Sequence, residues 1–94
     1  MKWSETNSWK STTWKGRKNG IKFDIEECHE GFSNTITGYY AFCKHIKENI
    51  VLNSLWILPE FNTLENAQMW CEELKIDKLK ELRDSGIDKR KENK

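Results

Sequence analysis

The chain has 94 residues, of which 36% are hydrophobic and 33% charged, and its formal net charge is +1. This length accommodates one small domain and excludes two domains of ordinary size. No apolar run is long enough to span a membrane, and the start Met1-Lys2-Trp3-Ser4-Glu5 is polar, so we expect no membrane segment, no signal peptide and a cytoplasmic location.

The charges are unevenly distributed along the chain. Residues 1–22 carry a net charge of +5, residues 23–73 carry −7 and residues 74–94 carry +3. A protein that mainly neutralises phosphates usually has a basic total and one basic face. The near-neutral total therefore argues against general nucleic-acid binding, but it leaves room for a local basic patch.

The first part of the chain predicts a β-hairpin. We expect residues 1–8 to be loosely ordered, 9–15 to form a strand, and 20–26 to form a second strand because apolar and polar residues alternate there. Asn19-Gly20 favours a two-residue turn, since both residues tolerate positive φ. The expected pairs are Lys18 with Ile21, Gly16 with Phe23 and Trp14 with Ile25, with the Phe23 ring covering Gly16.

The middle of the chain predicts two more strands. Residues 28–34 have the composition of a loop, and 35–46 that of a long strand that places Tyr40 opposite Phe23 and Phe42 opposite Ile21. That register puts Tyr40 and Phe42 on the core face, and it puts Tyr39, Ala41, Cys43 and His45 on the other face. The apolar run 50–58, closed by Pro59, predicts the fourth strand.

The C-terminal third predicts a helix. Asn62 has the spacing of a cap to Glu65, and an apolar stripe follows at Leu64, Ala67, Cys71 and Leu74. The stripe changes phase near Lys75 to Asp77, so the helix either breaks or turns its face there. Ser85-Gly86 predicts its end, and the charged residues 88–94 a disordered tail.

These elements predict a single α+β domain over residues 1–87. It is a four-stranded, mostly antiparallel sheet with the C-terminal helix packed on one face and the other face open. Among the tryptophans, we expect Trp14 and Trp56 in the core, Trp3 and Trp9 at the periphery, and Trp70 at a helix boundary, where it either packs or faces a partner. Monomer and homodimer both remain open.

The chain has no motif typical of a metal site or an enzyme. Cys28, Cys43 and Cys71 are widely spaced, which argues against a disulfide framework and against the short ligand pairs of zinc sites. Cys43 and His45 share a strand face, but side chains two residues apart on a strand lie about 7 Å apart, too far to chelate one ion. Adjacent Glu26 and Glu27 point to opposite faces. We therefore expect no catalytic residues, no metal and no cofactor.

A binding role fits the residues better. The predicted partner-binding residues combine aromatic rings with cations, the side chains favoured at protein interfaces and in RNA contacts. On the open face, Asp24 and Glu26 lie among them, and Lys15 with Asp24 is also compatible with an ordinary cross-strand ion pair. The predicted set is Trp9, Lys15, Arg17, Lys22, Tyr39, His45 and Trp70.

Several short segments give the chain a resemblance to a known class of protein. They are Trp14-Lys15-Gly16, Asn19-Gly20-Ile21-Lys22-Phe23-Asp24-Ile25, Gly38-Tyr39-Tyr40-Ala41-Phe42, Leu55-Trp56 and Leu64-Glu65-Asn66-Ala67-Gln68-Met69-Trp70. In their order they resemble small phage or prophage accessory proteins of low-GC Gram-positive bacteria, a class that includes anti-CRISPR inhibitors of host defence. The resemblance implies a stoichiometric protein-binding inhibitor and supplies no functional residues.

The expected function is therefore that of a non-enzymatic inhibitor from a mobile element. It would block a bacterial protein or ribonucleoprotein complex, such as a CRISPR effector, in the cytoplasm of the bacterial host cell. The alternative is a small RNA- or DNA-binding module that uses a basic and aromatic sheet face.

Overall fold

The structure, a computed structural model, describes residues 2–9, 11–31 and 35–92, and for residues 85–92 it describes the backbone alone. It confirms an α+β fold built on an antiparallel sheet, with five strands where we expected four. The strands follow chain order across the sheet: β1 (Ser4–Asn7), β2 (Thr12–Lys18), β3 (Ile21–His29), β4 (Ile36–His45) and β5 (Ile50–Asn53). A short 3-10 turn, η1 (Ser54–Trp56), and two helices, α1 (Leu64–Glu73) and α2 (Ile76–Glu92), complete it.

The β2–β3 hairpin forms in the predicted register. Lys18 lies opposite Ile21, Gly16 opposite Phe23 and Trp14 opposite Ile25. Asn19 and Gly20 have φ values of 56° and 78°, the left-handed conformation that a two-residue hairpin turn requires. Local turn chemistry is therefore sufficient to set this part of the sheet.

The N-terminal segment is more ordered than predicted. Ser4–Asn7 pairs with β2 as an edge strand, and Trp3 packs on the core. The Trp3 ring, and not the Phe23 ring, covers Gly16: a Cβ at Gly16 would lie 3.0 Å from Cε3 of Trp3. The Trp3 and Phe23 rings lie 6.3 Å apart, so Trp3 is not peripheral as expected.

The predicted register of the β3–β4 hairpin is wrong by three residues. Cys43 lies opposite Phe23 and His45 opposite Ile21, while Phe42 lies opposite Asp24. Because side chains alternate along a strand, a shift by an odd number of residues exchanges its two faces. Ala41, Cys43 and His45 therefore face the core, and Tyr40 and Phe42 lie on the opposite side of the sheet.

The fourth predicted strand is shorter than its apolar run. β5 ends at Asn53, whose side chain caps η1 by accepting a hydrogen bond from the Leu55 amide. Ser54 is fully buried, whereas Trp56 is 47% exposed, so the expectation that Trp56 belongs to the core is wrong. The turn redirects the chain before Pro59, where we had expected the strand itself to stop.

The helices break where the apolar stripe changes phase. Thr63, not Asn62, caps α1 by accepting a hydrogen bond from the Asn66 amide, and Leu74 ends it with an extended backbone. The predicted stripe is confirmed, because Ala67, Cys71 and Leu74 are buried. The helix continues past Ser85-Gly86, where we expected it to end. Residues 88–92 of the predicted tail belong to α2, and 93–94 lie outside the described residues.

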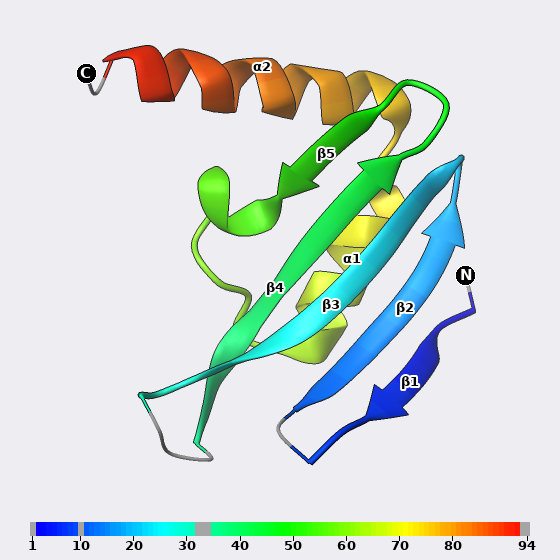
Figure 1. Cartoon of the computed structure of the whole chain (residues 1–94), viewed down its shortest axis with the longest axis vertical. Coiled ribbons are helices and arrows are strands. Elements are labelled where there is room, and N and C mark those ends of the chain that lie inside the picture. The colour runs from blue at the N-terminus through cyan, green and yellow to red at the C-terminus, as the bar shows by residue number, and fades with distance from the viewer. Residues whose placement is uncertain (1, 10, 32–34, 93–94) are drawn as a thin grey trace.

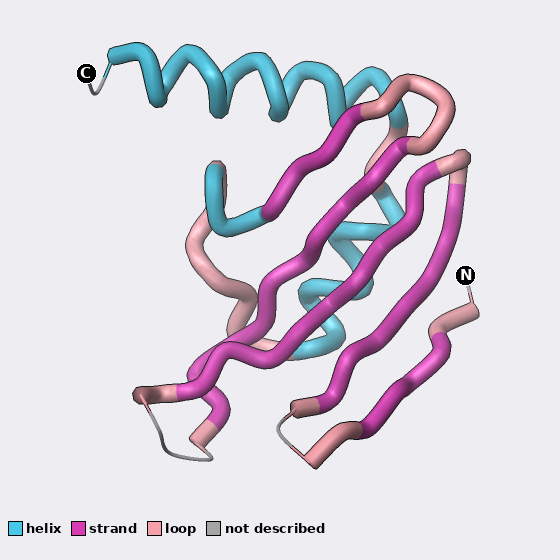
Figure 2. The backbone as a smooth tube through the Cα atoms, viewed as in Figure 1, coloured by secondary structure: helices cyan, strands magenta, loops and turns pink. Residues whose placement is uncertain are grey.

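The elements form two layers. The helix α1 lies behind the sheet and covers one face, and α2 lies near the beginning of β5, from which it diverges (Figures 1 and 2). Between the layers lies one apolar cluster that includes Trp14, Phe23, Leu52 and Leu79. The opposite face of the sheet, toward the viewer in Figure 1, carries no described helix. No helix in the described part of the chain has the length and apolar character needed to cross a membrane.

Candidate interaction surface

The sheet face opposite α1, called the open face below, is the candidate functional surface. Its members alternate along the strands with the buried core residues, as the pleat of a sheet requires. Side chains from all five strands and from the segment before β1 contribute. They are Lys2, Ser4, Thr13, Lys15, Arg17, Lys22, Asp24, Glu26, Tyr40, Phe42, Lys44, Val51 and Asn53.

Four cations line up across one end of the open face. Lys22 lies directly opposite Arg17 on one side and opposite Lys44 on the other. Lys2 lines the same shallow hollow of about 520 Å³ as Arg17 and Lys22. Among the described ion pairs, none involves these four residues, which we call the basic row.

Aromatic rings and carboxylates occupy the neighbouring part of the face. Lys15, Asp24 and Phe42 lie side by side on β2, β3 and β4, and Tyr40 lies opposite Glu26. A second hollow of about 340 Å³ is lined by these residues together with Thr13 and Asn53. Phe42 and Tyr40 are only partly buried, so part of each residue is accessible to a ligand.

Lys15 and Asp24 are paired by their positions in the sheet, and not by a described contact between their side chains. The two residues are directly opposite one another, as predicted. Within the described residues, however, their side chains make no ion pair. Both charges therefore remain available on the open face.

Glu26 is held by the phenol of Tyr40, which donates a hydrogen bond to its carboxylate. Burial, together with this bond and the Glu26 charge, raises the pKa of Tyr40 to about 12. The phenol is therefore neutral at physiological pH, and its hydrogen bond to Glu26 restrains the ring. A restrained ring loses little conformational entropy when a ligand stacks on it.

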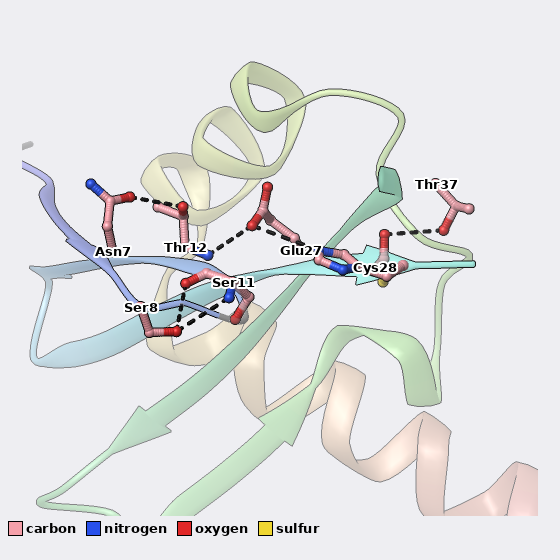
Figure 3. A network of polar contacts seen from close by, with 8 residues as sticks. Asn7, Ser8, Ser11, Thr12, Glu27, Cys28 and Thr37 are labelled. Carbon is pink, nitrogen blue, oxygen red and sulfur yellow. Dashed lines mark hydrogen bonds and ion pairs between the residues drawn. The ribbon is translucent and has the colours of Figure 1, made fainter. Parts of the chain in front are cut away.

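The end of the sheet remote from the basic row is closed by polar contacts (Figure 3). The Glu27 carboxylate accepts a hydrogen bond of 2.7 Å from the Thr12 amide, and the Thr12 hydroxyl donates to Asn7. On the other side, the Thr37 hydroxyl contacts the Cys28 carbonyl at 3.3 Å. Each of these contacts links two neighbouring strands, and together they extend across the sheet from β1 to β4.

The cysteines and histidines do not gather into a metal site. In the portion of the chain that the structure describes, no three metal-ligating side chains come together. All three cysteines are free; Cys43 and Cys71 are fully buried, and a mutual hydrogen bond and burial raise the pKa of Cys71. His45 Nδ1 accepts a hydrogen bond from the Glu48 amide, which anchors the β4–β5 turn.

The structure divides the seven predicted partner-binding residues. Lys15, Arg17 and Lys22 lie together on the open face. Tyr39 and His45 do not, because the corrected register turns them to the covered face, where Tyr39 packs edge-on against Trp14 at 5.8 Å.

The remaining two predicted residues lie elsewhere. Trp9 is 89% exposed between β1 and β2, at the opposite end of β2 from Arg17. Trp70 lies on α1, behind the sheet, and its ring packs against Phe61 at 5.6 Å. The packing expected for Trp70 as one of two roles is present, and its role toward a partner stays a prediction.

Sequence reasoning missed several members of the open face, and the charged and aromatic ones among them are Lys2, Tyr40, Phe42 and Lys44. Both faces of residues 35–46 carry aromatic rings, so hydrophobicity does not distinguish the core face from the outer face. Charge is the better signal: with Lys44 on the outside, the apolar Ala41 and Cys43 fall inside.

Comparison with known proteins found no match among family models, curated proteins or solved structures. The functional reading therefore depends on the surface itself. A sheet face that no described helix covers, with two aromatic rings and a row of cations that have no described ion-pair partner, is suited to binding a large, anionic partner.

Proposed function

We propose that this protein is a non-enzymatic binding protein that docks through its open face. In this proposal it is an inhibitor from a mobile element, which occupies a functional surface of a bacterial defence protein or ribonucleoprotein complex in the host cytoplasm. The observation that carries the proposal is the open face itself, a whole side of the sheet that no described helix covers.

The chemistry of the face supports docking over a purely structural role. A sheet face that only solubilises its protein would pair charges of opposite sign across strands. Here Arg17, Lys22 and Lys44 are placed side by side and have no described ion-pair partner. An anionic partner would neutralise this row, and its field would also raise the rate of association.

The architecture supports a mechanism of steric occupation. The β2–β3–β4 ladder that carries the face is backed by the core and by α1, so the surface is formed before binding. A preformed surface keeps more of the interaction energy as affinity. Blocking a site in this way requires neither a cofactor nor a reaction.

The experiment that tests the proposal compares two charge-reversal variants in a tagged pull-down from bacterial lysate and in a phage-plating assay. Lys22→Glu changes the centre of the basic row, and Lys78→Glu makes the same change of charge on the exposed side of α2, at the cost of a weak surface ion pair with Glu81. We expect the wild type and Lys78→Glu to retain the same defence protein and to restore plating, and Lys22→Glu to lose both.

Two results would refute this function. One is retention of the partner by Lys22→Glu at the wild-type level, which would place the interface elsewhere on the molecule. The other is unchanged plating in strains that carry active defence systems, which would remove the inhibitor role.

A further inference from the structure

The basic row is unfavourable for the fold. Directly opposed like charges on neighbouring strands destabilise a sheet, and Lys22 is opposed by a cation on each side. Sequences that break a rule of stability often do so at a functional site. A ligand with negative charge would remove this repulsion, so the arrangement points to an anionic ligand.

The dimensions of the row fit an extended polyanion. Adjacent strands lie about 4.8 Å apart, so cations on four neighbouring strands extend over about 14 Å. Lys2, Arg17, Lys22 and Lys44 occupy four such strands or their continuation. A line of this kind can follow a chain of phosphates, whereas an isolated anion would contact only one or two of its members.

The rings lie beside the row. Phe42 is two residues from Lys44 on β4, about 7 Å along the strand, and Tyr40 follows at the same interval on the same face. Aromatic side chains next to a basic groove are the arrangement on which unpaired bases stack. Duplex bases are already stacked on each other and would leave the rings without a role.

The carboxylates make one part of the open face different in charge from the other. Asp24 and Glu26 lie on the Phe42 and Tyr40 side of the basic row. Phosphates would be repelled there, but neutral bases would not, and a carboxylate accepts a hydrogen bond from a base amino group. The charge pattern therefore separates a track for the backbone from a platform for the bases.

From this arrangement we propose that the open face binds single-stranded nucleic acid. The basic row holds the phosphates, and the Phe42 and Tyr40 rings stack on the bases. The inference rests on the proposed function in one respect, that the open face is the interaction surface. In a ribonucleoprotein partner, the strand it covers would be the nucleic-acid component of that complex.

The test measures the fluorescence anisotropy of labelled twelve-residue oligouridylate and oligothymidylate, with a twelve-base-pair duplex as comparison. Four phosphate contacts on a single strand predict that the logarithm of the association constant falls with the logarithm of salt concentration with a slope of about −3. We expect both single strands to bind more tightly than the duplex. The two single strands also distinguish an RNA ligand from a DNA ligand.

Three variants separate the parts of the site. Lys22→Glu should weaken single-strand binding at least tenfold and flatten the salt slope, while Lys78→Glu should leave both unchanged. Phe42→Ala should weaken binding by about fivefold or more, as expected for the loss of one stacked base, without changing the slope. Thermal unfolding identifies any variant that fails to fold, and Lys22→Glu is expected to be at least as stable as the wild type.

Several outcomes overturn the inference. They are a wild type that does not bind either oligonucleotide at 50 mM salt, a Lys22→Glu variant that binds as the wild type does, and a duplex that binds better than the single strands. A defence protein that is retained after nuclease treatment and lost only in Lys22→Glu would indicate an acidic protein surface as the ligand. That last result would refute the nucleic-acid inference and leave the proposed function standing. Oligonucleotide binding without any effect on plating would refute the proposed inhibitor function and leave the nucleic-acid inference standing.

Discussion

Ser54 is the clearest example of a single residue on which the sheet depends. It is fully buried at the end of β5, and its hydroxyl oxygen accepts a 2.9 Å hydrogen bond from the amide of Ala41 in β4. The amide of Ala41 is therefore satisfied by a side chain. Without that hydroxyl, a buried donor would have no partner in the contacts described.

Replacing Ser54 by alanine should lower the free energy of unfolding by about 1 to 3 kcal/mol, the cost of leaving a buried donor unsatisfied. The matched control is Ser4→Ala on the exposed strand β1, which should change it by less than about 0.5 kcal/mol. Urea unfolding followed by tryptophan fluorescence measures both. Equal stability of the two variants would show that water replaces the lost acceptor.

Cys28 makes a pH-dependent contribution to the stability of the folded state. Burial, followed by a hydrogen bond to the Glu60 carboxylate and the charges of Glu60 and Glu26, raises the pKa of its thiol from 9.0 to about 11. Between these two values the unfolded chain has released the proton and the folded chain has kept it. The folded state therefore loses stability as the pH rises from about 9 to 11.

This effect can be isolated with Cys28→Ser, because serine does not titrate in that range. The wild type should lose more stability than the variant between pH 8.5 and 11, measured as the shift of the urea midpoint in each protein. Tyr40 is present in both proteins, and only the smallest cause of its raised pKa, the charge of Cys28, differs between them. A constant difference between the two proteins across this range would contradict the raised pKa.

At the scale of elements, sequence was most informative where a local signal sets the structure. The Asn19-Gly20 turn fixes the β2–β3 register by itself, since its loop length leaves one pairing. The sequence of the β3–β4 connection contains no Asn-Gly dipeptide, and there the predicted register was wrong by three residues. The faces of β4 were decided by burial of Ala41 and Cys43 under α1, a contact between segments distant in sequence.

The helix α2 shows how an element with a weak sequence signal joins the core. Its apolar residues are few, yet Leu79 is fully buried, and Ile76 and Leu82 are packed against the same cluster. The helix lies near the beginning of β5, an edge strand of the sheet (Figure 1). Docking through Leu79 therefore joins α2 to the end of the sheet at which β5 begins.

Leu79→Ala should destabilise the protein by about 2 to 5 kcal/mol, the usual cost of truncating a fully buried leucine. Leu55→Ala is the matched control, because Leu55 is 44% exposed on η1 and should cost far less. Chemical unfolding monitored by circular dichroism measures the difference. Similar values for the two variants would show that α2 is not held by the core.

At the scale of the whole molecule, the net charge of +1 is the sum of 16 basic and 15 acidic residues. Global charge repulsion is small at this net charge, so electrostatic effects on stability come from local arrangements. The described part of the open face holds five cations and two carboxylates, with the cations gathered toward one end.

This arrangement predicts an effect of salt on stability. At 50 mM NaCl, Lys22→Glu should raise the free energy of unfolding by about 0.5 to 1 kcal/mol, because it replaces two like-charge cross-strand pairs by attractive ones. The gain should shrink at 1 M NaCl, where the screening length is about 3 Å. Thermal unfolding at the two salt concentrations tests this, and Lys78→Glu should show no gain at either. A destabilised Lys22→Glu would mean that Arg17 and Lys44 do not repel Lys22.

The sequence by itself determined the fold class, the first hairpin, the apolar stripe of α1 and the break before α2. These features follow from turn chemistry and residue periodicity, which act between neighbours in the chain. Only the tertiary structure decided that residues 4–7 add a fifth strand, that Trp3 covers Gly16, and that Tyr40 and Phe42 share a face with the basic row. Those outcomes depend on which apolar surfaces are buried together, and burial is a property of segments that meet in space.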